Sequence, residues 1–203
     1  LCRVAIKDDK TVAVVEVNSE TDFVAKNEDF QAYVEAVAKQ AVESDSAELD
    51  AFLAEPWHLD SAKTVKDALV DKIAVIGENL TIRRFEKVVA NDGCAVSYVH
   101  GGGRIGVIVE AATDVVNDAV KEALTNIAMQ VAALYPKYVS TDEVSEEYKA
   151  HEKEILMAQA KNDPKNANKP ENIIEKMIAG RLSKELKEVC LLEQEYVKAE
   201  NKE

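Results

Sequence analysis

Positive charge is scarce in this chain of 203 residues. Lysine and arginine number 25 against 38 aspartates and glutamates, so the net charge is −13 at pH 7. A protein whose main partner is a nucleic acid needs a basic surface that displaces counterions from the phosphates. We therefore expect no direct nucleic-acid partner. An acidic surface suits instead a protein partner that carries basic patches.

Cysteines and long apolar runs are also few. The three cysteines, Cys2, Cys94 and Cys190, are far apart and odd in number, so a reducing, cytoplasmic compartment is expected rather than a disulfide framework. No run reaches the roughly 18 apolar residues of a membrane-spanning helix, and no membrane partner is expected. The first residues, 1–4, read as a strand without a signal peptide, and we expect the chain to be cut from something longer.

Metal-binding and catalytic motifs are missing from the pattern. His58, His100 and His151 lie tens of residues apart, so no zinc-binding spacing is present. The glycines 101–103 join two strand-like segments, whereas a phosphate-binding loop opens onto a helix. A lipase-type oxyanion loop would need a G-x-S-x-G elbow, which the chain lacks. An enzyme with Cys94 or His100 as its reactive group is therefore the weaker hypothesis.

What the chain does have is an apolar pattern that occurs twice. Hydrophobic residues make up 47% of the sequence, enough for a core, and the length suits two small domains. Each half reads as a β-hairpin, an acidic turn and a long helix, which predicts a duplicated unit. Asn27 caps the first of these helices, and the second follows Thr113-Asp114. The two predicted strand pairs are 3–7 with 11–17 and 95–100 with 104–110.

Two other regions complete the predicted order of elements. Residues 61–75 read as a helix that Gly77 ends, before a strand at 80–90. Residues 144–188 read as two charged helices around the breaker 162–166, and each helix alone would be marginal in water. We expect them to pair along an antiparallel seam. The predicted seam residues are Tyr148, Ile155 and Ala158 on the first helix and Ile174, Met177, Arg181 and Leu182 on the second.

These patterns predict an α+β fold. It has two similar β-hairpin/helix subdomains with small antiparallel sheets, plus an inserted antiparallel helical hairpin, or coiled coil. The predicted boundaries are 1–92 for the N-subdomain of the core, 93–143 for its C-subdomain and 144–188 for the helical hairpin. The C-subdomain is completed by 189–203, of which 189–197 reads as extended.

The segment 16–27 carries the most specific signal. A strand runs into a polar turn that presents Asp22 and Phe23 side by side before the helix. An aromatic residue at such a junction is either a staple into the chain's own core or a contact for a partner. The residues alone favour a core role for Phe23, since aromatic side chains are mostly structural, and a turn role for Asp22. Trp57, beside Pro56 in a loop, is open to either interpretation.

Several segments, in order along nearly the whole chain, resemble the bacterial elongation factor Ts family. They are 16–27, Ile76-Gly77-Glu78-Asn79-Leu80-Thr81-Ile82-Arg83-Arg84, Ser97-Tyr98-Val99-His100 with Arg104-Ile105-Gly106-Val107, and Ile127-Ala128-Met129. The tail is also similar, from Glu175 to Arg181 and then in Val189-Cys190-Leu191-Leu192. The resemblance implies the family's two core subdomains and its coiled coil. It also implies a core fragment, without the family's N-terminal helical domain and its extreme C-terminus, whose second sheet has an open edge.

The resemblance implies a guanine-nucleotide exchange factor that binds elongation factor Tu and is not an enzyme. Asp22 and Phe23 would wedge against the partner's helices that support its magnesium and phosphate site. Ile76, Gly77 and Glu78 would belong to the same patch, and His100 would contact the partner's third domain. GDP, GTP and Mg²⁺ belong to the partner, so the chain itself needs no cofactor.

Three alternatives stay open. The first is a structural adaptor that uses the helical hairpin to join other proteins. The second is a homodimer through the coiled coil. The third is a divalent cation held by Glu16, Glu20 and Asp22 in the acidic turn. The turn lacks the glycine of the usual calcium loop, which makes the cation hypothesis the weakest.

Overall fold

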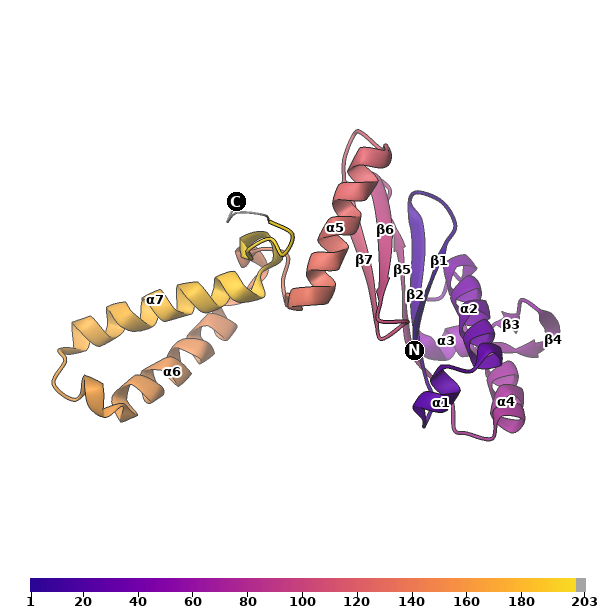
Figure 1. Ribbon diagram of the computed structural model, residues 1–203, viewed down its shortest axis with the longest axis horizontal. Helices are drawn as coiled ribbons and strands as arrows, with labels where there is room; N and C mark the ends of the chain where they lie inside the picture. The colour runs from indigo at the N-terminus through magenta and orange to yellow at the C-terminus, as the bar shows by residue number, and fades with distance from the viewer. Residues whose placement is uncertain (200–203) are drawn as a thin grey trace. The chain divides into compact units, whose positions relative to one another are not determined.

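The computed structural model describes residues 1–199. The chain divides into two compact units, an N-terminal unit from Leu1 to Ala132 and a C-terminal unit from Ala133 onward. Figure 1 labels the elements, which are β1 (Cys2–Ile6), β2 (Thr11–Asn18), α1 (Asp22–Ala25), α2 (Glu28–Glu43), α3 (Leu49–Ala54), β3 (Pro56–Trp57), β4 (Asp60–Thr64), α4 (Val65–Ile76), β5 (Thr81–Val89), β6 (Gly93–His100), β7 (Ile105–Ala112), α5 (Asp118–Leu134), α6 (Glu146–Asn162) and α7 (Glu171–Val189). Short 3₁₀ turns cover 141–143, 164–166 and 191–193. This is the predicted α+β class.

The first sheet is antiparallel, in the order β1-β2-β5. Its opening hairpin turns at Asp8, whose Oδ1 accepts hydrogen bonds from the Lys10 and Thr11 nitrogens at 2.8 and 2.7 Å. The pairing of β5 with β2 gives this sheet a third strand. Since the sheet of β6 and β7 has two strands among the described residues, the two halves are not simple copies.

Helix α2 covers one face of the first sheet. Asn27 caps it as predicted, its Oδ1 accepting from the Phe30 nitrogen at 3.0 Å. Phe30, Val34 and Val37 are fully buried, together with the β2 side chains that point toward the helix. Phe52 and Trp57 also belong to this core. Trp57, 6% exposed, is therefore a packing residue.

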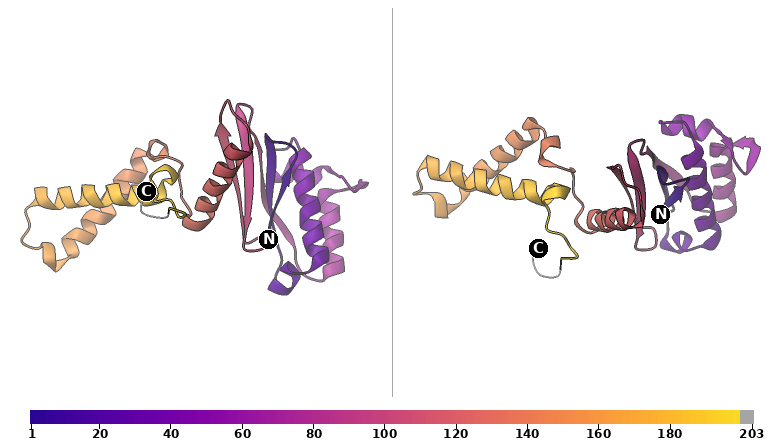
Figure 2. Two further views of the ribbon diagram at one scale, coloured as in Figure 1. Left: turned by 45° about the horizontal axis from the view of Figure 1, so that its top comes forward. Right: turned by 90° about the horizontal axis from the view of Figure 1, so that it is seen from above.

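The hairpin of β6 and β7 lies against the other face of the first sheet. A Cβ atom on Gly106 would sit 2.8 Å from the Val14 Cγ2 atom and 3.1 Å from the Cys2 Cβ atom, so this approach requires glycine. Val12, Ala90 and Ala95 are buried between the sheets. Helix α5 covers the outer face of β6 and β7 through Leu124 and Ala128. The N-terminal unit thus has four layers: α2, the first sheet, the β6–β7 sheet and α5. Both views in Figure 2 show this order.

The predicted helix at 61–75 is wrong over its first four residues. Residues 60–64 form β4, and the helix starts at Val65. The reason is a capping box, in which the Thr64 Oγ1 accepts from the Asp67 nitrogen and the Asp67 Oδ2 accepts from the Thr64 nitrogen. The predicted end is right, because Gly77 closes α4 in the left-handed conformation, at φ 79°.

In the C-terminal unit α6 and α7 pair as a helical hairpin (Figure 1). Its buried seam is Leu156 and Ala160 against Ile178. The predicted seam was right in Ile174 and Leu182, which pack beside it. It was wrong in Ile155, Ala158 and Arg181, which are exposed. Because α6 is highly charged, its sequence is compatible with more than one buried face, and the prediction chose the wrong face.

The predicted extended run at 189–197 is also wrong at its start. Helix α7 continues to Val189, and residues 191–193 form a 3₁₀ turn. Cys190 is buried and bridges to Tyr138. The domain boundaries at 92, 143 and 188 stay predictions, and residues 200–203 of the segment 189–203 lie outside the described residues. No helix within 1–199 has the length and apolar character needed to cross a membrane.

The seam yields a stability prediction. Ile178→Ala should lower the free energy of unfolding of the helical hairpin by about 2–5 kcal/mol, because it leaves a cavity at a fully buried position. Ile173→Ala is the matched control on the same helix, where the side chain is 41% exposed and the loss should stay below about 1 kcal/mol. Amide hydrogen exchange of α6 and α7 measures both. Equal losses would contradict the assigned seam.

Candidate partner-binding site

The turn after β2 presents Phe23 to solvent. Thr21 caps the short helix α1, since its side chain accepts from the Val24 nitrogen. Phe23 is the second residue of that helix, and its side chain is 81% exposed, the largest fraction of any large hydrophobic side chain described. Asp22 beside it is also exposed, and its Oδ2 pairs with the Lys26 Nζ at 3.2 Å. Phe23 is therefore not a staple into the chain's own core.

Glu78 holds this turn from the loop after α4. Its Oε2 accepts from the Glu20 nitrogen at 3.1 Å and the Thr21 nitrogen at 3.0 Å, and its Oε1 accepts from the Thr21 hydroxyl at 2.5 Å. In return the Glu20 Oε2 accepts from the Asn79 nitrogen at 3.2 Å. We call these four hydrogen bonds the carboxylate clamp. It joins two loops 57 to 59 residues apart in the chain.

The end of α4 supplies the support for the clamp. Ile76 is half-buried and packs on the core that α2 shares with the first sheet. Gly77 follows in the left-handed conformation, which a residue with a Cβ atom adopts only with strain, and turns the chain so that Glu78 leaves the helix. Ile76 thus anchors this loop on the core, Gly77 turns the chain, and Glu78 makes the carboxylate clamp. These are the three residues that the sequence resemblance placed in one patch with Asp22 and Phe23.

His100 lies at the tip of the other hairpin. It is exposed, and its Nδ1 lies 2.8 Å from the Tyr98 hydroxyl. The Cys2 nitrogen donates to the Gly103 carbonyl at 2.6 Å, and the Leu1 nitrogen donates to the Val17 carbonyl at 2.8 Å. These two bonds put the hairpin tip at the same end of the first sheet as the turn after β2. The structure thus joins Glu78 to Glu20 and Thr21, the residues just before Asp22 and Phe23, and leaves His100 as a separate group at that end.

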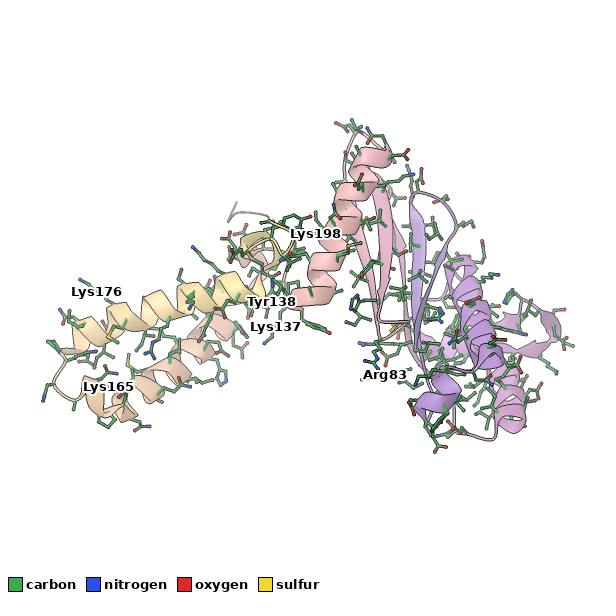
Figure 3. The ribbon with its side chains drawn as sticks, in the orientation of Figure 1. Arg83, Lys137, Tyr138, Lys165, Lys176 and Lys198 are labelled. Atoms are coloured by element: carbon green, nitrogen blue, oxygen red, sulfur yellow. The ribbon has the colours of Figure 1, made fainter. Side chains whose placement is uncertain are left out.

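Glu16 ties the strands that lead into the two loops. Its Oε1 lies 3.0 Å from the Arg83 Nη1 and its Oε2 lies 2.7 Å from the Arg84 Nε. Burial alone raises the pKa of this carboxyl, but hydrogen bonds from Arg83, Arg84 and Asn18 outweigh that effect and bring the pKa to about 2. Figure 3 labels Arg83, which projects from the start of β5 at the end of the sheet where α1 lies.

The cation hypothesis finds no support in this geometry. Glu16 is bound by the two arginines, Glu20 by Asn79, and Asp22 pairs with Lys26. Among residues 1–199 no group of three or more histidine, cysteine, aspartate or glutamate side chains is arranged to hold a metal ion. The geometry gives no support to the enzyme hypothesis either. Cys94 is fully buried, and His100, at the opposite end of β6, has the Tyr98 hydroxyl as its side-chain hydrogen-bond partner.

Sequence reasoning missed three members of the site. Glu20, Thr21 and Asn79 make the carboxylate clamp with Glu78. The sequence suggested only a cation-ligand role for Glu20 and no individual role for Thr21 or Asn79. Thr21 carried a usable signal, since a threonine before a short apolar run is a typical helix cap. The pairing of Glu20 with Asn79 had no local signal, because it depends on two loops meeting in the fold.

Glu16 gives a pH prediction. A pKa lowered from 4.5 to about 2 stabilises the fold fully above about pH 5, and the contribution is lost as pH falls toward 2. Glu16→Gln should therefore reduce the free energy of unfolding by about 1–2 kcal/mol at pH 7 and by nearly nothing at pH 2. Urea denaturation measured across this range is the test. The exposed Glu122→Gln on α5 is the control, and a Glu16→Gln deficit that does not depend on pH would refute the assignment.

Comparisons with known proteins bear on the whole chain. The family model described as Elongation factor TS matches residues 20–203. Elongation factor Ts of Clostridioides difficile (strain 630) is 52% identical over 199 residues, which is 98% of this chain and 63% of that protein.

Two further relatives carry the same name. Elongation factor Ts of Clostridium botulinum (strain Eklund 17B / Type B) is 47% identical over 95% of this chain and 61% of its own length. That of Halothermothrix orenii is 43% identical over 98% of this chain and 64% of its own length. The chain thus spans less than two thirds of the length of these relatives. On this evidence the chain belongs to the elongation factor Ts family.

Proposed function

We propose that this chain acts in translation elongation as a guanine-nucleotide exchange factor that binds elongation factor Tu and promotes release of its GDP. The observation that carries the proposal is Phe23, a large aromatic side chain 81% exposed on a turn that the carboxylate clamp fixes. Exposing such a side chain to water is costly unless a partner covers it. Because the clamped turn is rigid, insertion of the Phe23 side chain can push against the partner's helices as a wedge.

The thermodynamics of exchange requires no acid or base. A factor that binds the empty partner more tightly than the GDP-loaded partner lowers the affinity for GDP by the same ratio. Each tenfold change corresponds to about 1.4 kcal/mol, and burial of a phenylalanine ring stabilises a complex by about 2 kcal/mol. A few well-placed contacts are therefore sufficient. The chain is accordingly proposed to be non-enzymatic, with the nucleotide and Mg²⁺ bound by the partner.

Each predicted site residue has a role in this proposal. Phe23 is the wedge against the helices that support the partner's magnesium and phosphate site, and Asp22 binds the partner beside it. Ile76, Gly77 and Glu78 contribute to the same patch, both as contacts and by holding the turn in place. His100 is proposed as a separate contact with the partner's third domain, in which its imidazole needs no proton transfer.

Release of fluorescent GDP from elongation factor Tu tests the proposal. The chain should accelerate release, and Phe23→Ala should reduce that acceleration on the order of 30-fold, as expected from about 2 kcal/mol of lost burial. The variant should fold normally, because the side chain is exposed.

Val115→Ala is the matched control. Val115 is the residue that follows Thr113-Asp114 in the second half of the chain, where Phe23 follows Thr21-Asp22 in the first, and it is 54% exposed. Its truncation should leave GDP release unchanged. The proposal fails if the chain does not accelerate release, or if Phe23→Ala and Val115→Ala behave alike.

A further inference from the structure

Among the described residues, 1–199, strand β1 has a free edge. In the sheet order β1-β2-β5 it pairs there with β2 alone. Lys7 donates to the Thr11 carbonyl and Leu1 bonds Val17 in both directions, so the odd-numbered residues of this strand form the hydrogen-bonded pairs with β2. The backbone groups of the even-numbered residues therefore point away from β2.

Only the first of these outward residues has a partner in the described structure. The Cys2 nitrogen donates to the Gly103 carbonyl, and the Cys2 carbonyl accepts from the Arg3 guanidinium at 3.0 Å. Val4 and Ile6 pair with nothing on that side within residues 1–199. They offer two N–H donors and two C=O acceptors in a row. An unpaired edge of this kind is a template for another strand.

The free edge lines a groove of about 830 Å³ within the N-terminal unit. One wall comes from α2 and the His58 loop, the other from the tip region of the β6–β7 hairpin. The lining residues are Arg3, Val4, Ala5, Ile6, Lys7, Glu35, Lys39, Val42, Glu43, His58, Val99 and Gly102. A strand laid in this groove would extend the first sheet by one strand and would have one face toward each wall.

The wall on the α2 side carries a small positive charge, although the chain as a whole is acidic. Leu1 and Ala5 pack on the core that α2 shares, so Arg3 and Lys7 lie on the same face. They pair with Glu35 at 3.7 Å and Glu43 at 2.7 Å. Lys39, exposed on α2, makes no ion pair with the described residues. The charged groups of the groove therefore sum to +1, from three cations and two anions, in a chain whose net charge is −13.

The other wall is apolar. The even-numbered residues of β1 face the second sheet, as the contact that a Gly106 Cβ would make with Cys2 indicates. Val4 and Ile6 lie on this face, Ile6 is 64% exposed, and Val99 lines the groove opposite them. The two walls thus demand different side chains of an incoming strand, acidic on one face and aliphatic on the other.

We infer that the β1 edge is a second docking site, which binds an extended segment of a partner protein whose residues alternate between acidic and aliphatic. Backbone hydrogen bonds to Val4 and Ile6 give the affinity, as in other cases of strand addition. Acidic side chains on one face meet Lys39, and aliphatic side chains on the other cover Val4, Ile6 and Val99. The inference does not rest on the proposed exchange activity.

The test uses the chain and a fluorescent peptide of alternating valine and glutamate. Fluorescence anisotropy should detect binding, and amide hydrogen exchange should show new protection at Val4 and Ile6. The Ala5 amide, already bonded to β2, should change little. Two control peptides separate the contributions of charge and of backbone hydrogen bonds. A peptide with lysine in place of glutamate should not bind, because its charge is reversed. A peptide N-methylated at alternate valines should not bind, because it lacks backbone N–H donors.

Charge reversal on the groove wall supplies the matched variants. Lys39→Glu should weaken binding about tenfold, whereas Lys66→Glu, an exposed lysine on α4 outside the groove, should not. The inference is overturned if the peptide does not bind, if the lysine or N-methylated peptide binds equally well, or if Val4 and Ile6 gain no protection. Protection of these amides without peptide, in a chain that sediments as a dimer, would assign the edge to a second copy and also overturn it.

Discussion

The reciprocal hydrogen bonding of two carboxylates across two loops is the constraint on which the site depends. Glu78 accepts three hydrogen bonds from the turn that precedes Phe23, and Glu20 of that turn accepts one from the loop of Glu78. Charge-assisted bonds of this kind are stronger than neutral ones, but these are solvent-exposed and act together rather than singly. These hydrogen bonds hold the backbone of the turn in place, so that the Phe23 side chain stays exposed to solvent.

The layered fold supplies the rigid base for that constraint. Both clamped loops leave well-packed elements: the turn follows β2, the central strand of the first sheet, and Glu78 follows α4, whose Ile76 packs on the same core. The Glu16 carboxylate ties β2 to β5 just behind them. A partner that pushes on Phe23 thus meets a sheet, a helix and an ion-pair network. Such a base suits the wedge role that we propose.

Much of this could be predicted from the sequence. The hairpins, the Asn27 cap, the Gly77 stop and the α+β class all followed from local patterns, because turn and cap residues act over a few positions. Residues 61–64 were misassigned because the Thr64-Asp67 capping box competes with the apolar pattern. The α6 seam failed because a highly charged helix presents more than one plausible face. The clamp partners Glu20 and Asn79 could not be predicted, since they meet only in the folded chain.

A double-variant cycle on GDP release from elongation factor Tu tests the central claim most directly, with Phe23→Ala, Glu78→Ala and the two combined. If the clamp acts by holding Phe23 in place, Glu78→Ala should slow release strongly by itself and add little once Phe23 is truncated. The coupling should then be about 1 kcal/mol or more. Effects that add in full would mean that Glu78 and Phe23 act independently, and would contradict the account.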